Sequence, residues 1–110
     1  MEDREKRMAQ NEALFREVNE RVNDLVPGFA VVDTAYEYLC ECANVDCTFR
    51  VSVDPDEYEA VRRDPAQFLV LPLHFTPEVE ELVAKHDAYW VVRKTGEAAE
   101  YVSHLDPRSR

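Results

Sequence analysis

The segment Cys40-Glu41-Cys42-Ala43-Asn44-Val45-Asp46-Cys47 holds all three cysteines of this 110-residue chain. An odd number of cysteines argues against a disulfide framework in a cytosolic protein, the class expected here. The C-x-C-x4-C spacing lies on a polar turn between two extended segments, where several thiolates can converge on one point. Tetrahedral Zn²⁺ accepts sulfur and nitrogen ligands, and four of them usually close a structural site. The segment therefore predicts a zinc knuckle of three thiolates and one histidine.

The chain offers three histidines as the fourth ligand: His74, His86 and His104. His104 lies in a C-terminal segment that we expect to be loose. His74 reaches the cysteines if the strand at 67–71 runs antiparallel to the strand at 48–53. His86 reaches them if the strand at 88–94 runs parallel to 48–53, as a right-handed crossover would place it.

We prefer His74, because its loop, 72–75, lies outside any repeated unit, whereas His86 can simply cap a helix. The predicted zinc ligands are thus Cys40, Cys42, Cys47 and His74, with His86 as the alternative fourth ligand.

Other interpretations of the cluster remain open. The cysteines can be three reduced thiols without a metal, or a redox switch in which oxidation ejects zinc. An iron–sulfur cluster is disfavoured, because it usually requires four cysteines. If zinc is bound, acid should weaken its binding by protonating the thiolates.

An amphipathic helix is predicted from about residue 8 to 25. Its apolar residues recur at steps of three and four: Leu14, Phe15, Val18, Val22 and Leu25. Glu12 and Arg16, four residues apart, are expected on the outer face. Pro27-Gly28 should end the helix. Its apolar stripe either docks on the core of its own chain or binds a partner.

Extended segments are predicted at 29–39, 48–53, 67–71 and 88–94, from their β-branched and aromatic residues. Asp54-Pro55-Asp56-Glu57 carries a capping box and predicts a helix to about Asp64. Thr76-Pro77-Glu78 has the same start signal and predicts a second short helix to about Lys85. The two helix–strand units align 22 residues apart, with Pro55 on Pro77. This is either an internal repeat or a coincidence of shared capping rules.

These elements predict one α+β domain. It comprises an N-terminal amphipathic helix, a small sheet of three to four strands with two short helices, and a zinc-knuckle hairpin from Tyr36 to Val53. We expect the domain to span 8–104, after a flexible charged lead-in at 1–7 and before a flexible tail at 105–110.

The chain is acidic, with 13 Lys and Arg against 23 Asp and Glu, a formal charge of −10. Such a surface repels nucleic acid and anionic membranes, so we expect neither as a direct partner. No apolar run approaches the roughly 20 residues of a membrane span, and the charged N-terminus does not resemble a signal peptide. A cytoplasmic protein is expected. Nine acidic residues against three basic ones fall in 33–64, which suits either solubility or a basic protein partner.

No enzymatic activity is expected. The two glycines lie far apart, so there is no phosphate-binding loop, and the His-x-Glu and Cys-x-x-Cys elements of zinc deaminases are absent. A small zinc hydrolase would need an open coordination position, with Glu41 as its base; otherwise Glu41 is a solvated carboxylate of the turn. The favoured function is a non-enzymatic binding or regulatory module held by structural zinc. A redox-responsive zinc switch comes next, and a zinc hydrolase last.

The chain resembles a group of short uncharacterised bacterial proteins, mostly from actinobacteria. The resemblance rests on these stretches: Asn11–Arg21, Cys40-Glu41-Cys42 with Cys47, Glu57–Arg62, Asp64-Pro65, Phe68 and Tyr89–Val92. In that group the loop after the third extended segment is often Pro-Gly-His-Glu, and here it is Pro72-Leu73-His74-Phe75. The histidine is kept while both of its neighbours differ. The resemblance implies a cytosolic bacterial protein and supports His74, and it brings no assigned activity.

Overall fold

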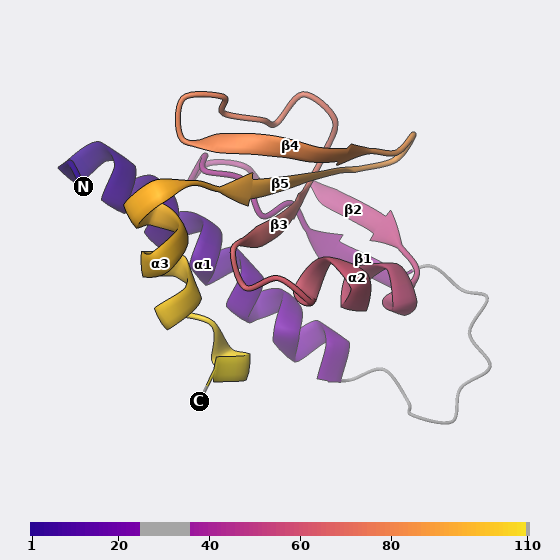
Figure 1. The fold of residues 1–110 in the computed structure, drawn as a ribbon. Helices are drawn as coiled ribbons and strands as arrows, with labels where there is room; N and C mark the ends of the chain where they lie inside the picture. Colours follow the sequence, from indigo (N-terminus) through magenta and orange to yellow (C-terminus); the bar gives the residue numbers. More distant parts are fainter. Residues whose placement is uncertain (25–35, 110) are drawn as a thin grey trace.

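A long helix, two small antiparallel sheets and short helical segments make up the fold in Figure 1, a computed structural model that describes residues 1–24 and 36–109. The predicted α+β class is confirmed. The elements are, in order: α1 (Asp3–Asp24), β1 (Tyr36–Leu39), β2 (Arg50–Val53), α2 (Pro55–Arg62), β3 (Gln67–Val70), β4 (Glu80–Lys85), β5 (Trp90–Lys94), α3 (Gly96–His104) and the 3₁₀ turn η1 (Pro107–Ser109). Leu25 and Pro27-Gly28, the expected end of the first helix, lie outside the described residues.

β1 and β2 form a two-stranded antiparallel hairpin, with Tyr36 opposite Val53. In β2 the predicted alternation is confirmed: Val51 and Val53 are buried, and Arg50 is exposed. The strand rises from the cysteine loop, so the hairpin carries that loop at one end.

The other strands form a separate sheet in the order β3-β5-β4, antiparallel throughout. The predicted small sheet is thus three-stranded, and the hairpin forms a sheet of its own. Glu41, just after β1, approaches the free edge of β3, where its backbone N–H donates to the carbonyl of Leu69 at 2.7 Å. The side chain of Glu41 then accepts from the N–H of Leu69 at 2.9 Å. Because a carboxylate occupies that donor, the ladder does not continue from one sheet to the other.

The predicted helix at 76–85 is also wrong, because this segment is a turn followed by β4. The residues that predicted a helix start form a turn instead. The Val79 N–H donates to the Thr76 carbonyl, and the Thr76 N–H donates to the Glu80 carboxylate at 2.8 Å. β4 then supplies hydrogen bonds to β5, with Glu80 opposite Lys94. The first predicted helix is confirmed as α2, with Asp54 and Glu57 forming its capping box. The proposed helix–strand repeat is thus not repeated in structure.

α1 begins at Asp3, earlier than expected, and it turns a polar stripe inward. Leu14 is 57% exposed and Val18 is 38% exposed, whereas Glu12, Arg16 and Asn19 are fully buried. Of the predicted apolar stripe, Val22 packs against the core whereas Leu14 and Val18 do not, and the prediction that Glu12 and Arg16 lie on the outer face is wrong. Ala9 and Ala13 are buried between them, so their small side chains let the helix approach the sheets closely.

Specific partners explain why polar residues fill this face. Arg16 donates to the carbonyls of Pro65 and Val102 and stacks on a core phenylalanine ring. Glu12 lies 2.5 Å from the ammonium group of Lys94, and burial raises its pKa well above the usual value. Such partners offset the cost of burying polar groups, although the Glu12 carboxylate has the ion pair and no hydrogen bond.

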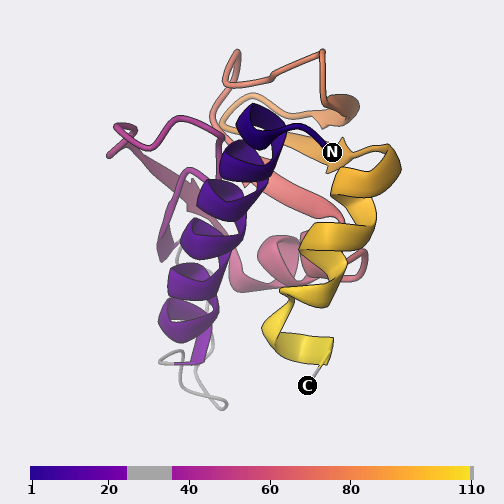
Figure 2. The ribbon, with the colours of Figure 1, turned by 90° about the vertical axis from the view of Figure 1, so that its left-hand side faces the viewer.

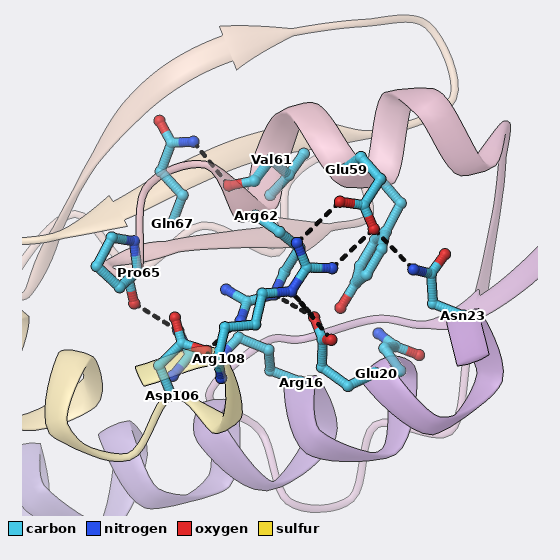
Figure 3. Close-up of polar contacts among 12 residues, drawn as sticks. Arg16, Glu20, Asn23, Glu59, Val61, Arg62, Pro65, Gln67, Asp106 and Arg108 are labelled. Atoms are coloured by element: carbon cyan, nitrogen blue, oxygen red, sulfur yellow. Dashed lines mark hydrogen bonds and ion pairs between the residues drawn. The ribbon is translucent and has the colours of Figure 1, made fainter. Parts of the chain in front are cut away.

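α3 lies beside α1, as Figure 2 shows, and continues into the C-terminal turn. This last segment is tied down by charge. Arg62 of α2 forms ion pairs with Glu20 of α1 and with Asp106, while Arg108 reaches Glu20 and Glu59 (Figure 3). Among the helices of the described residues, none has the length and apolar character needed to cross a membrane.

Candidate metal centre

Cys40 and Cys42 follow β1 in an extended stretch. Alternate side chains of extended backbone point to opposite sides, so these two thiols share a side and Glu41 faces away. The N–H of Cys40 donates to the Phe49 carbonyl at 3.1 Å, which extends the hairpin by one bond. Both thiols are buried. The C-x-C spacing thus delivers two sulfurs to one point without any turn between them.

A tight turn brings Cys47 back to that point. The N–H of Cys47 donates to the carbonyl of Asn44 at 3.0 Å, and the Asn44 side chain accepts from the N–H of Asp46. Asparagine favours such turns because its side chain can hydrogen-bond its own backbone two residues on. Cys47 is only partly buried, since its loop is exposed.

A second turn, after β3, presents His74. The N–H of His74 donates to the carbonyl of Leu71 at 3.0 Å, and between them stand Pro72 and Leu73. Leu73 has φ 70°, the only positive φ of a non-glycine residue in the described chain. Proline followed by a left-handed residue is typical of a type II turn, in which glycine is preferred at the second position. A strained leucine therefore directs His74 toward the cysteines.

The four candidate ligand atoms of Cys40, Cys42, Cys47 and His74 all lie within 4.8 Å of one another. The Nδ1 atom of His74 is 3.4 Å from the sulfur of Cys40 and 3.7 Å from that of Cys47. Zn–S bonds of about 2.3 Å and Zn–N bonds of about 2.0 Å at tetrahedral angles separate nitrogen from sulfur by about 3.5 Å. The two distances from His74 thus match those expected around a tetrahedral ion.

Hydrogen bonding within the cluster separates the acidities of the thiols. The bond between Cys40 and Cys42 raises the pKa of Cys40, as burial does, and lowers the pKa of Cys42 to about 5, with a further contribution from His74. Burial raises the pKa of Cys47. The lowered pKa of Cys42 favours its thiolate, the form in which cysteine binds a metal. Leu71 N–H also donates to the Cys40 sulfur at 3.2 Å.

The side chain of Glu41 is directed into the core. It is fully buried and accepts hydrogen bonds from the N–H of Leu69, the amide of Asn19 and the hydroxyl of Tyr58. The prediction that Glu41 is a solvated carboxylate of the turn was therefore wrong. Burial raises its pKa, while these donors act in the opposite direction. Its carboxylate lies in the core, opposite the thiols, where it joins the knuckle to α1, α2 and β3.

The structure separates the three histidines. His74 joins the cysteines, and Phe49 packs edge-on against its ring at a centroid distance of 6.0 Å. His86 stacks instead on Tyr89 in the turn between β4 and β5, and His104 is exposed at the end of α3. The strand β4, and not a helix, leads directly into His86, so the helix-capping role considered for it is not realised.

Beside the cluster, Cys42 and His74 line a cavity of about 240 Å³ that opens to solvent. A metal site needs an entry path of this kind.

Asn19 is a supporting residue that sequence reasoning missed. Its side chain pairs with both backbone groups of Leu39 and with Glu41, so it holds the end of β1 as a neighbouring strand would. The signal was present: Glu12, Arg16, Asn19 and Asn23 recur at steps of four and three, a polar stripe at helical spacing.

No protein-family model, curated protein or solved structure matches this chain, so the candidate site rests on its own geometry.

Proposed function

We propose that this protein is a small zinc-binding protein. A Cys3His site stabilises its fold, and its surface binds another molecule. The observation that carries the proposal is the convergence of Cys40, Cys42, Cys47 and His74 within 4.8 Å. Two loops that are far apart in the sequence meet there. Structural zinc sites have four protein ligands, and catalytic sites keep one position open for water.

A structural role is favoured over catalysis by two features. All four positions of a tetrahedral ion have a protein donor, so none is left for a substrate. The carboxylate nearest in sequence, Glu41, is turned into the core and fully hydrogen-bonded. Binding of structural zinc contributes directly to folding free energy, because the unfolded chain lacks the assembled site.

Native mass spectrometry of untagged protein, purified without added metal, tests the site. We expect one zinc per chain, released by a chelator and lost in His74→Ala. His86→Ala is the matched control, because His86 lies outside the cluster, and it should retain the metal. Zinc retained in both variants would indicate an open site or another ligand. A wild-type chain that binds no metal would refute the proposal.

For the binding partner, we propose a basic protein surface. Several acidic side chains of the segment 33–64 already have partners: Glu41 is buried, and Glu59 pairs with Arg108. The exposed acids that remain include Glu37, Asp46 and Asp56. Reversing these three charges to lysine should abolish salt-sensitive capture of a cationic polypeptide such as polylysine. Reversing Glu2, Asp3 and Glu100 together is the charge-matched control.

A redox-responsive zinc switch is the second candidate, favoured by the partial exposure of Cys47. Hydrogen peroxide would take two electrons from two thiolates, which join as a disulfide while the peroxide leaves as two hydroxide ions. The site then loses two ligands and releases its zinc. Release of zinc to a colorimetric chelator at mild peroxide doses, reversed by a thiol reductant with added zinc, would support the switch. Zinc retained throughout would exclude it.

A further inference from the structure

A second hollow, separate from the cysteine cluster, lies between α2 and the hairpin of β4 and β5. Its volume is about 400 Å³, within the range of sites that bind small molecules. Its walls are mainly apolar, with Ala60 and Val61 from α2 and Val83, Ala84 and Val91 from the hairpin. We call it the α2 groove. It shares no residue with the cluster.

A β-bulge shapes one wall of the α2 groove. The pairing of β4 with β5 shifts register between Leu82 and Ala84, so Val83 is left without a partner in the ladder. Val83 is 48% exposed and lines the groove. Bulges commonly redirect a side chain beside a functional site, and they also keep a second strand from pairing with a sheet edge. The bulge therefore disfavours pairing of an added peptide strand at this edge and leaves the side chain of Val83 at the groove.

The polar side of the α2 groove has one carboxyl group. Glu57 is its only acidic residue, and neither lysine nor arginine is among its described lining residues. The Tyr89 hydroxyl donates to Oε2 of Glu57 at 2.8 Å, and the backbone N–H of Asp54 donates to Oε1. Each carboxylate oxygen has a further lone pair, so Glu57 can accept from a ligand without losing these bonds. His86, stacked on Tyr89, completes this side.

We propose that the α2 groove binds a small organic cation: an apolar body against Val61, Val83 and Val91, and an ammonium or amidinium group facing Glu57. Apolar walls favour the body through burial of its surface. Because no lysine or arginine is among the described residues that line the groove, the carboxylate of Glu57 favours a positively charged ligand. A ligand bearing a carboxylate would face Glu57 with like charge and no compensating cation.

Three probes with one shared body test the charge preference: phenethylammonium, 2-phenylethanol and 3-phenylpropionate. The full zinc-saturated chain, labelled with ¹⁵N, is titrated with each at constant ionic strength. Amide shifts should be largest around Val83, Ala84 and Tyr89. We expect phenethylammonium to bind about tenfold more tightly than phenylethanol, the size of one charge-assisted contact, and phenylpropionate not to bind.

Two variants place the contact. Glu57→Gln retains a side chain that completes a capping box and removes the charge, so phenethylammonium should bind it only as tightly as phenylethanol binds wild type. Glu37→Gln, the same charge change at an exposed position on β1, should leave affinity unchanged. Val83→Lys, at an exposed residue, places a cation at the groove and should abolish binding of phenethylammonium.

The proposal is overturned if the anion binds as well as the cation, if no probe shifts the groove amides, or if Glu57→Gln binds phenethylammonium like wild type. Circular dichroism of each variant separates loss of the ligand from loss of the fold. If Glu57→Gln fails to fold, Val83→Lys decides between the outcomes.

Discussion

The cysteine–histidine cluster and the arginine cluster of Arg62 and Arg108 both connect segments that are distant in the sequence, but through different chemical groups. The first joins the loop after β1 to the loop after β3. The second joins α1, α2 and the C-terminal turn through Glu20, Glu59 and Asp106 (Figure 3). One is suited to a metal ion and the other consists of ion pairs within the chain. The comparison shows that a small domain can hold separate parts of its core by separate means, each sensitive to a different condition.

The largest effect is expected at the metal-binding cluster. Cys42→Ser removes one thiolate, and structural zinc contributes on the order of 10 kcal/mol in small domains, so the variant should lose most of its stability. Thermal unfolding followed by circular dichroism measures this. A chelator should lower the melting temperature of wild type toward that of the variant. Equal melting temperatures of wild type and variant in zinc-containing buffer would contradict a structural metal.

A smaller loss is expected at the buried centre of the arginine cluster. Arg62→Met removes the ion-pair partner of Asp106 and leaves Glu20 with Arg108 alone, and breaking a buried ion pair costs about 3–5 kcal/mol. Urea denaturation of zinc-saturated protein measures it. Arg63→Met is the matched control, because Arg63 is the next residue and is exposed, and it should cost less than about 0.5 kcal/mol. Similar losses in both variants would remove the distinction.

The outer part of the arginine cluster should respond to pH. The hydrogen bonds and charge of Arg108 hold the pKa of Glu59 below its ordinary value of 4.5. A depressed folded-state pKa means that the stabilisation is complete above the unfolded-state value and is lost as pH falls through the folded-state value. Arg108→Gln should therefore cost about 1 kcal/mol or less at pH 7.

The cost of Arg108→Gln should begin to fall below about pH 4.5, the ordinary pKa of a glutamate, and should vanish below the depressed pKa of Glu59. Denaturant titrations at pH 7 and across the acid range, on wild type and variant together, measure the difference. A cost that stays constant down to acid pH would show that Arg108 acts through packing rather than through Glu59.

The smallest effect is expected at the turn that positions His74. Leu73 is 82% exposed and holds a left-handed conformation, which costs a non-glycine residue about 1 kcal/mol. Leu73→Gly removes that strain, and after the greater chain entropy of glycine it should gain about 0.5 kcal/mol. Leu73→Ala is the control, because it shortens the side chain and keeps the strain. Urea denaturation at saturating zinc should rank glycine above both leucine and alanine.

The metal-ligand group and the helix α2 could be predicted from the sequence, because each depends on the chemistry of particular residue types. Few residue types bind zinc, so three cysteines and a loop histidine already identified the group that the fold assembles. α2 was readable for a similar reason, because its capping box involves only neighbouring residues.

The errors arose where distant residues decide. Glu12 points inward because it pairs with Lys94, and Arg16 does so because it donates to two backbone carbonyls. In an isolated helix both side chains would face water. Thr76-Pro77-Glu78 satisfies a turn as well as a helix start, and pairing with β5 determines which one forms.

The segment that follows β1 has a further consequence for solubility. It occupies one edge of β3 through Glu41, and β3 reads Gln-Phe-Leu-Val, a short apolar strand without charge. Uncovered strands of that composition associate edge to edge with other copies. If the cluster binds zinc as proposed and release of the metal loosens Cys40 and Cys42, the segment between them also leaves the edge of β3. Bound zinc would then protect the protein from aggregation, and the first sign of zinc depletion would be precipitation of the protein.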